Sequence, residues 1–87
     1  MLFIKDMIVK LTQFRVGQSG RIKSYLSGIS GYRQKLLALG LVPGTVFKVI
    51  RVAPLGDPLE LRIRNFSLSL RKQESSILEV EPLHDSD

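Results

Sequence analysis

Cysteine is absent from this chain, and histidine occurs once, at position 84. Without cysteine, disulfides, iron–sulfur clusters and cysteine-based zinc sites are excluded. With a single imidazole and no thiol, the sequence offers no Ser/His/Asp or Cys/His catalytic arrangement. It also has no glycine-rich phosphate loop. We therefore expect no catalytic residue, no cofactor and no enzymatic activity.

Long apolar runs are missing too. None approaches the roughly 18 residues that a membrane-spanning helix needs. The apolar residues at the start of the chain are interrupted by Lys5 and Asp6, so they are too short for the apolar core of a secretory signal. We therefore expect a cytoplasmic protein that associates with a membrane only through a partner.

Acidic residues are missing between Asp6 and Asp57, while lysine and arginine recur there, and the net charge is +5. Such a basic stretch either carries solvated side chains or meets RNA, DNA, anionic lipid or an acidic protein. For a nucleic acid, the aromatic residues available for stacking are Phe14, Tyr25, Tyr32 and Phe47. Most of these fit core positions equally well, so we expect no nucleic acid as a partner. A small nucleic-acid-binding barrel stays the alternative function.

Potential metal ligands gather at the end of the chain, at Glu79, Glu81, His84, Asp85 and Asp87. Their oxygen and nitrogen donors suit a divalent first-row ion. The residues after Pro82 are expected to form a loose tail, which does not preorganise ligands. The two glutamates fit the outer face of a last strand, and we predict no metal site.

The pattern of apolar residues predicts one short helix among several strands. Residues 20–26 alternate, with Ile22, Ser24 and Leu26 on one face. Ser30 is a candidate N-cap, and Gly40 fits the residue after the helix, where Leu41 can fold back on Leu36. Residues 42–45 suit a type II turn. The stretch 11–16 fits either a helical turn or a strand.

Further strands are predicted over residues 45–53, 59–64, 66–70 and 77–81, with a phase change at Asn65. Residues 71–76 are polar enough for a loop or a single helical turn. Five short strands with one inserted helix indicate a mainly β protein, a small and strongly bent barrel. The expected core shares one face of each element and comprises Ile22, Leu36, Leu37, Leu39, Val46, Leu61, Ile63, Leu68 and Leu70.

Three segments of the chain resemble the FeoA family, small proteins of bacterial ferrous-iron uptake. They are residues 32–44, with the turn Leu-Gly-Leu-Val-Pro-Gly, residues 51–58, with Ala-Pro-Leu-Gly-Asp-Pro, and residues 67–72. The resemblance covers about residues 11–81. It implies an SH3-like five-stranded barrel that binds the FeoB membrane transporter at its cytoplasmic GTP-binding region. The protein would then meet the inner face of the cytoplasmic membrane through that partner.

The resemblance also suggests the boundaries of the domain. Residues 1–10 are expected to be an N-terminal extension, residues 11–82 the SH3-like domain, and residues 83–87 a flexible tail. The first eight residues exceed the shorter family pattern and fit either a disordered start or an added strand. The similar barrels of iron-dependent repressors carry a helix-turn-helix domain, which this sequence lacks.

The partner-binding surface is expected at two loops fixed by proline and glycine, Gly40–Gly44 and Pro54–Pro58, because such loops lose little conformational freedom on binding. Leu41, Val42 and Leu55 are apolar residues there and candidate anchors, with Arg33, Lys35 and Arg51 as a basic rim. In the alternative, Leu41 and Leu55 fold back to close the barrel. The full predicted surface is Leu41, Val42, Pro43, Arg51, Leu55, Gly56 and Asp57.

Overall fold

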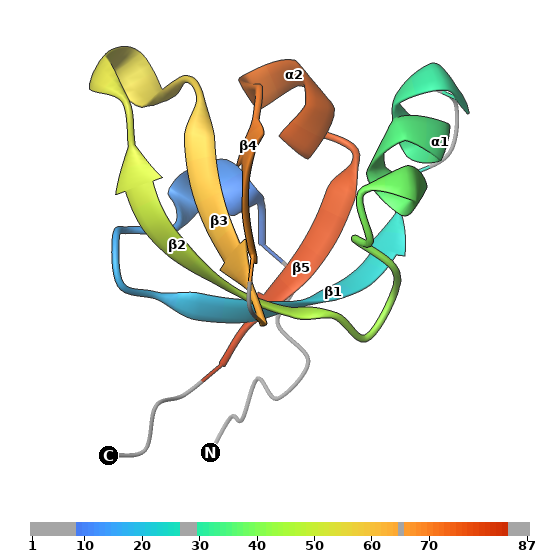
Figure 1. The fold of residues 1–87 in the computed structure, drawn as a ribbon, viewed down its shortest axis with the longest axis horizontal. Helices are drawn as coiled ribbons and strands as arrows, with labels where there is room; N and C mark the ends of the chain where they lie inside the picture. Colours follow the sequence, from blue (N-terminus) through green and yellow to red (C-terminus); the bar gives the residue numbers. More distant parts are fainter. Residues whose placement is uncertain (1–8, 27–29, 65, 84–87) are drawn as a thin grey trace, which may run out of the picture.

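The computed structural model describes residues 9–26, 30–64 and 66–83 of the chain. Strands dominate, with one longer helix and several short helical turns (Figure 1). In chain order the elements are η1 (Leu11–Gln13), β1 (Ser19–Tyr25), α1 (Ser30–Ala38), β2 (Val46–Val52), η2 (Pro54–Gly56), β3 (Leu59–Ile63), β4 (Phe66–Leu70), α2 (Lys72–Ser75) and β5 (Leu78–Pro82).

The strands form one antiparallel sheet in the order β4-β3-β2-β1-β5. The sheet bends around a single core, with η1 and α2 on its concave side and α1 beside the end of β1 (Figure 1). This confirms the predicted mainly β fold with one inserted helix. The segment 11–16 begins with a 3₁₀ turn, and the segment 71–76 contains the helical turn α2.

Strand β1 contains a glycine that packing requires. A β-carbon at Gly20 would lie 2.6 Å from a ring atom of Phe47 and 2.7 Å from one of Phe14. The two rings pack against each other with centroids 5.4 Å apart. Gly20 therefore lets both phenylalanines approach the backbone of β1, which the sequence pattern did not predict.

Helix α1 ends as expected. Gly40 adopts a φ of +93°, the Gly40 N–H donates to the Leu37 carbonyl, and the Leu41 N–H donates to the Leu36 carbonyl. These two bonds form a Schellman motif, which satisfies carbonyls that the helix leaves free. Leu36 and Leu41 are both buried, so the predicted contact of the helix with its end is present. The Ser30 side chain, the candidate N-cap, lies outside what the structure describes.

Most of the residues predicted for the core are buried or half-buried, but two of them are exposed. Leu37 and Val46 are exposed, at 39% and 47%. Leu37 lies on the outer side of α1, and Val46 begins β2 on the face opposite Phe47. The buried apolar residues are Leu11, Phe14, Ile22, Leu36, Leu41, Phe47, Val49, Leu59, Leu61, Ile63, Leu70, Ile77, Leu78 and Val80.

One predicted face is wrong because the strand register changes locally, whereas Phe66 shares the inner face of the buried Ile63 but lies beyond the core. The pairing of β1 with β5 shifts between Ile22 and Ser24, which places Tyr25 against the core and leaves Leu26 43% exposed. A bulge of this kind moves every side chain beyond it to the opposite face of the strand. Phe66 is 44% exposed because it lies at the tip of the β3–β4 hairpin, beyond the core.

Val9 forms an isolated bridge with Val80, although it falls within the predicted extension of residues 1–10. Residues 1–8 and 84–87 lie outside the described part, and the domain boundaries stay a prediction. No helix in the described ranges is long and apolar enough to cross a membrane.

Candidate functional site

The turn after α1 is fixed to the barrel by backbone hydrogen bonds. The Thr45 N–H donates to the Val42 carbonyl at 3.0 Å, and Gly44 adopts a φ of +94°. These are the features of the predicted type II turn. The Gly44 N–H also donates to the Ile22 carbonyl of β1, and the Ile22 N–H donates to Thr45. The turn is therefore a rigid continuation of the sheet.

The tip of the β3–β4 hairpin lies against this turn. A β-carbon at Gly40 would lie 3.8 Å from ring atom Cζ of Phe66. Between turn and tip is a groove, which we call the turn groove. Val42, Val46 and Phe66 contribute apolar side chains to it that are each more than 40% exposed. Its full lining is Gly40, Val42, Pro43, Gly44, Thr45, Val46, Ile63, Arg64 and Phe66.

The connection Pro54–Pro58 presents a large aliphatic side chain, Leu55, to solvent between two exposed prolines. Leu55 is 98% exposed and adopts a φ of +69°, a region that disfavours residues with a β-carbon. The Asp57 carboxylate accepts a hydrogen bond from the Lys72 backbone N–H at 2.9 Å. This bond joins the connection to the start of α2. Leu55 is thus held in an unfavourable backbone conformation while contributing nothing to the core.

The two predicted loops lie at opposite ends of β2. The turn groove begins where β2 starts at Val46, and the connection follows where β2 ends at Val52. Seven residues of strand place the two ends about 20 Å apart. The structure therefore separates the predicted surface into two contact regions, the turn groove and the Leu55 connection.

The Leu41 side chain is fully buried, so it is not an exposed anchor. Its carbonyl accepts a hydrogen bond from the Tyr25 hydroxyl. Burial raises the pKa of the Tyr25 phenol above its usual value, which favours the protonated donor. For Leu41 the alternative prediction, that it closes the barrel, is correct. Leu55 does not fold back at all.

The other predicted surface residues lie where a partner can reach them. Val42 and Pro43 are exposed in the turn, and Arg51 is exposed near the end of β2. Asp57 is exposed beside a half-buried Gly56. Whether these residues bind a partner stays a prediction.

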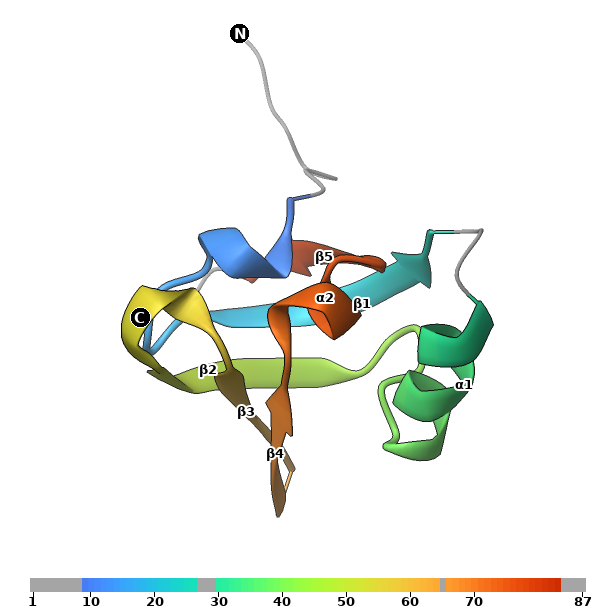
Figure 2. The ribbon, with the colours of Figure 1, turned by 90° about the horizontal axis from the view of Figure 1, so that it is seen from above.

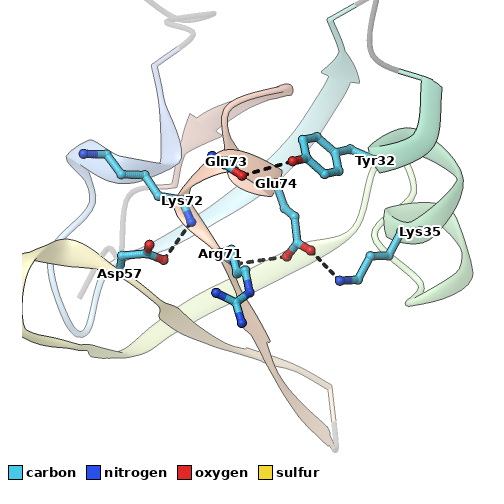
Figure 3. A network of polar contacts seen from close by, with 7 residues as sticks. All are labelled: Tyr32, Lys35, Asp57, Arg71, Lys72, Gln73 and Glu74. Carbon is cyan, nitrogen blue, oxygen red and sulfur yellow. Dashed lines mark hydrogen bonds and ion pairs between the residues drawn. The ribbon is translucent and has the colours of Figure 1, made fainter.

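The helical turn α2 links α1 to the Leu55 connection through polar contacts (Figure 3). The Tyr32 hydroxyl donates to the Gln73 side chain at 3.1 Å, and the Lys35 ammonium contacts the Glu74 carboxylate. Glu74 is buried and also accepts from the Arg71 backbone N–H. The bond from Lys35, followed by that backbone bond, lowers the pKa of Glu74 below its ordinary value.

The predicted basic rim is only partly available. Lys35 is paired with Glu74, and the Arg33 guanidinium lies over the Tyr25 ring at 5.7 Å from its centroid. Both residues lie on α1, whereas Arg51 lies at the far end of β2. The three residues therefore do not surround one site.

The aromatic residues considered for nucleic-acid stacking are engaged elsewhere. Phe14 and Phe47 are buried in the core, 5% and 1% exposed. Tyr25 and Tyr32 are half-buried and use their hydroxyls in hydrogen bonds. Base stacking needs an exposed ring face, so this set does not form a stacking platform.

The candidate metal ligands that the structure describes already have partners. The Glu79 carboxylate accepts from the Ser24 hydroxyl at 2.6 Å, and Glu81 pairs with Arg21 and Lys23. Residues 9–26, 30–64 and 66–83 contain no group of three or more possible ligands. His84, Asp85 and Asp87 lie outside these ranges.

Three residues of the turn groove were missed from the sequence. Val46 was expected in the core but lies on the outer face of β2, opposite Phe47. Phe66 follows the inward alternation of β4, which does not tell whether the core extends to the strand end. Arg64 adopts a φ of +53° in the hairpin turn. The phase change at Asn65 signalled this turn, but not its position against the turn after α1.

The family profile and a curated relative indicate one family for this chain. The FeoA domain profile matches residues 9–82. An Fe(2+) transport protein A/Fe(2+) transporter FeoB fusion protein of Porphyromonas gingivalis is 32% identical over 73 residues. The match covers 84% of this chain but 8% of the fusion protein, so this chain spans a small part of that relative.

Solved structures support the same assignment. The FeoA-like protein of Clostridium acetobutylicum is 32% identical, with a TM-score of 0.81 and 92% of each chain covered. FeoA of Stenotrophomonas maltophilia, described as a prokaryotic SH3 domain protein, has a TM-score of 0.71 over 84% of this chain and 89% of its own. At 21% identity, that likeness speaks for the SH3-like fold alone. With its profile match and its five-stranded barrel, the chain belongs to the FeoA family, whose members are linked to ferrous-iron transport.

Proposed function

We propose that this chain is a non-enzymatic, cytoplasmic accessory protein of ferrous-iron uptake that binds the FeoB transporter at its cytoplasmic GTP-binding region. The single observation that carries the proposal is the fusion relative, in which a similar domain and a FeoB transporter share one chain. Domains that act together are brought to a high effective concentration by such a covalent link.

The exposed apolar side chains support a protein partner. Leu55 is almost fully exposed on a loop whose backbone is fixed by two prolines, and it is the proposed anchor. The turn groove supplies a second contact through Val42 and Phe66. A typical stable interface buries about 800 Å² on each partner, a patch wide enough to include both ends of β2.

Calorimetric titration of the full chain into the purified cytoplasmic region of FeoB tests the proposal. We expect Leu55→Asp to abolish measurable binding, because an anchor residue typically contributes more than about 2 kcal/mol. Val42→Asp is expected to weaken binding less. Both side chains are exposed, so both variants should keep the thermal unfolding curve of the parent.

Val16→Asp is the matched control, because Val16 is 60% exposed and lies outside both contact regions. It should bind like the parent. Absence of binding by the parent would refute the proposed function. Full binding by Leu55→Asp would refute the anchor and leave the partner in place.

A further inference from the structure

Two cations face each other on the outer side of the barrel, and Glu60, two residues before Arg62 on the same face, lies opposite Arg51 instead. Lys48 of β2 lies directly opposite Arg62 of β3, and both are exposed. Side chains at such positions lie about 5 Å apart at their β-carbons, where like charges destabilise a sheet. Within the described part of the chain, no ion pair includes either residue.

The same side of the sheet carries further positive charge. Arg21 of β1 lies opposite Val46, the neighbour of Lys48 on the outer face of β2. Glu81 is shared by Arg21 and Lys23 and its side chain is 11% exposed, so one carboxylate serves two cations. Arg64 is exposed two residues beyond Arg62. We call Arg21, Lys48, Arg62 and Arg64 the basic face.

Apolar side chains border this face at the hairpin tip. Val46 lies on the same face as the cations, and Val42 follows in the adjoining turn groove. Phe66 pairs with the buried Ile63 and therefore lies on the inner face of the hairpin. The β3–β4 hairpin projects from the rest of the barrel (Figure 2). Cations next to half-exposed apolar residues on a projecting element are suited to the boundary between water and lipid headgroups.

We propose that the basic face binds an anionic lipid bilayer directly, with the hairpin tip toward the headgroups. The face is the convex outer side of the sheet, and no ion pair within the described ranges engages Lys48 or Arg62. Lys48 and Arg62 are therefore available to lipid phosphates, and the exposed apolar side chain of Val46 beside them favours the headgroup boundary over a purely acidic protein surface. The buried phenylalanines and bonded tyrosines disfavour single-stranded nucleic acid. The lipid proposal rests on the proposed function in one respect only, because binding to FeoB would bring the protein close to a membrane.

Co-sedimentation of the full chain with vesicles tests this. Vesicles of phosphatidylcholine containing phosphatidylglycerol should bind the protein, with affinity falling as salt increases, and vesicles of phosphatidylcholine alone should not. The double variant Lys48→Gln/Arg62→Gln should lose at least about tenfold in partition coefficient. The charge-preserving variant Lys48→Arg/Arg62→Lys should bind like the parent.

The matched control is Lys10→Gln/Arg15→Gln, which has the same net charge and alters exposed residues beside η1, away from the basic face. It should lose less than about twofold. An equal loss in both glutamine variants, or no binding by the parent, would overturn the proposal. If Lys48→Gln/Arg62→Gln impaired only the titration with FeoB, the face would belong to an acidic protein surface and the lipid proposal would be wrong.

The vesicle measurement contains no transporter, so its failure leaves the proposed contact with FeoB untouched. Thermal unfolding provides a further check, because removing the repulsion between Lys48 and Arg62 should keep or raise the melting temperature. Loss of lipid binding in a variant that melts like the parent therefore reports on the surface and not on the fold.

Discussion

Leu41 and Leu55 occupy similar sequence settings but opposite environments. Each lies next to a glycine, in a loop that also contains proline. Leu41 is fully buried and Leu55 is 98% exposed. The difference comes from the preceding element, because α1 ends in a Schellman motif that turns Leu41 back onto Leu36. The connection before Leu55 follows a strand end and has no such motif.

The comparison shows that a loop with a fixed backbone either adds a side chain to the core or holds a side chain in solvent. The Leu41 backbone is held by the helix end and by the Tyr25 hydroxyl. The Leu55 connection is fixed by a hydrogen bond to a neighbouring element, because the Lys72 N–H at the start of α2 donates to the Asp57 carboxylate. Because Leu55 keeps an unfavourable φ of +69° without gaining any packing from it, we expect a functional role for this residue.

Replacing each leucine by alanine should give the largest difference in stability between the two environments. Leu41→Ala removes a buried side chain and is expected to lower the free energy of unfolding by about 2–5 kcal/mol. Leu55→Ala should change it by less than about 0.5 kcal/mol. Urea denaturation of both variants measures this. Similar losses in the two would contradict the assigned burial.

The contact between α1 and α2 should add a smaller, pH-dependent contribution. Glu74→Gln removes the charge that Lys35 meets, at an expected cost of about 1 kcal/mol at neutral pH, since Lys35 is largely exposed. The lowered pKa of Glu74 means that this stabilisation is present above the ordinary glutamate pKa. It is lost as the pH falls through the folded-state value.

Denaturation curves at neutral and acidic pH therefore should differ in a defined way. The parent and Glu74→Gln should become equally stable in acid, where the parent carboxylate is also protonated. A stability difference that stayed constant over the whole range would show that the charge of Glu74 contributes nothing.

Leu55→Gly is expected to have the smallest effect on stability. It should therefore show the effect of the Leu55 side chain on binding alone. Glycine tolerates the φ of +69°, which relieves a cost of about 1 kcal/mol, while its freedom in the unfolded chain offsets most of that gain. Stability should stay within about 0.5 kcal/mol of the parent, and FeoB binding should fall. A marked loss of stability would mean that Leu55 packs against something in the fold.

The sequence predicted the elements of the fold better than the direction of their side chains. Alternation placed β3, and the order of Ser30, Gly40 and Pro43 placed α1 and its end. The bulge in β1 was not predictable, because the pairing with β5 that creates it joins residues far apart in the chain. The packing role of Gly20 was not predictable either, because nothing local in the sequence reveals the two rings packed against it.

The candidate site was predicted in its parts but not in its arrangement. Proline and glycine indicated two rigid loops, and Leu55 is exposed as an anchor requires. That the loops lie at opposite ends of β2 follows from sheet topology, which sequence spacing does not contain. The meeting of Lys48 with Arg62 likewise depends on register across a hairpin, so the basic face was visible only as scattered charge.

The pairing of β1 with β5 has a consequence for the order in which the chain can fold during synthesis. Residues near position 20 bond to residues near position 80, and Val9 joins the same edge through Val80. Strand β1 therefore cannot pair with β5 until the ribosome has released that strand. Such distant contacts slow folding. The same closure brings the domain's two ends together, so the whole barrel can be inserted between other segments of a longer chain with little separation of its flanks.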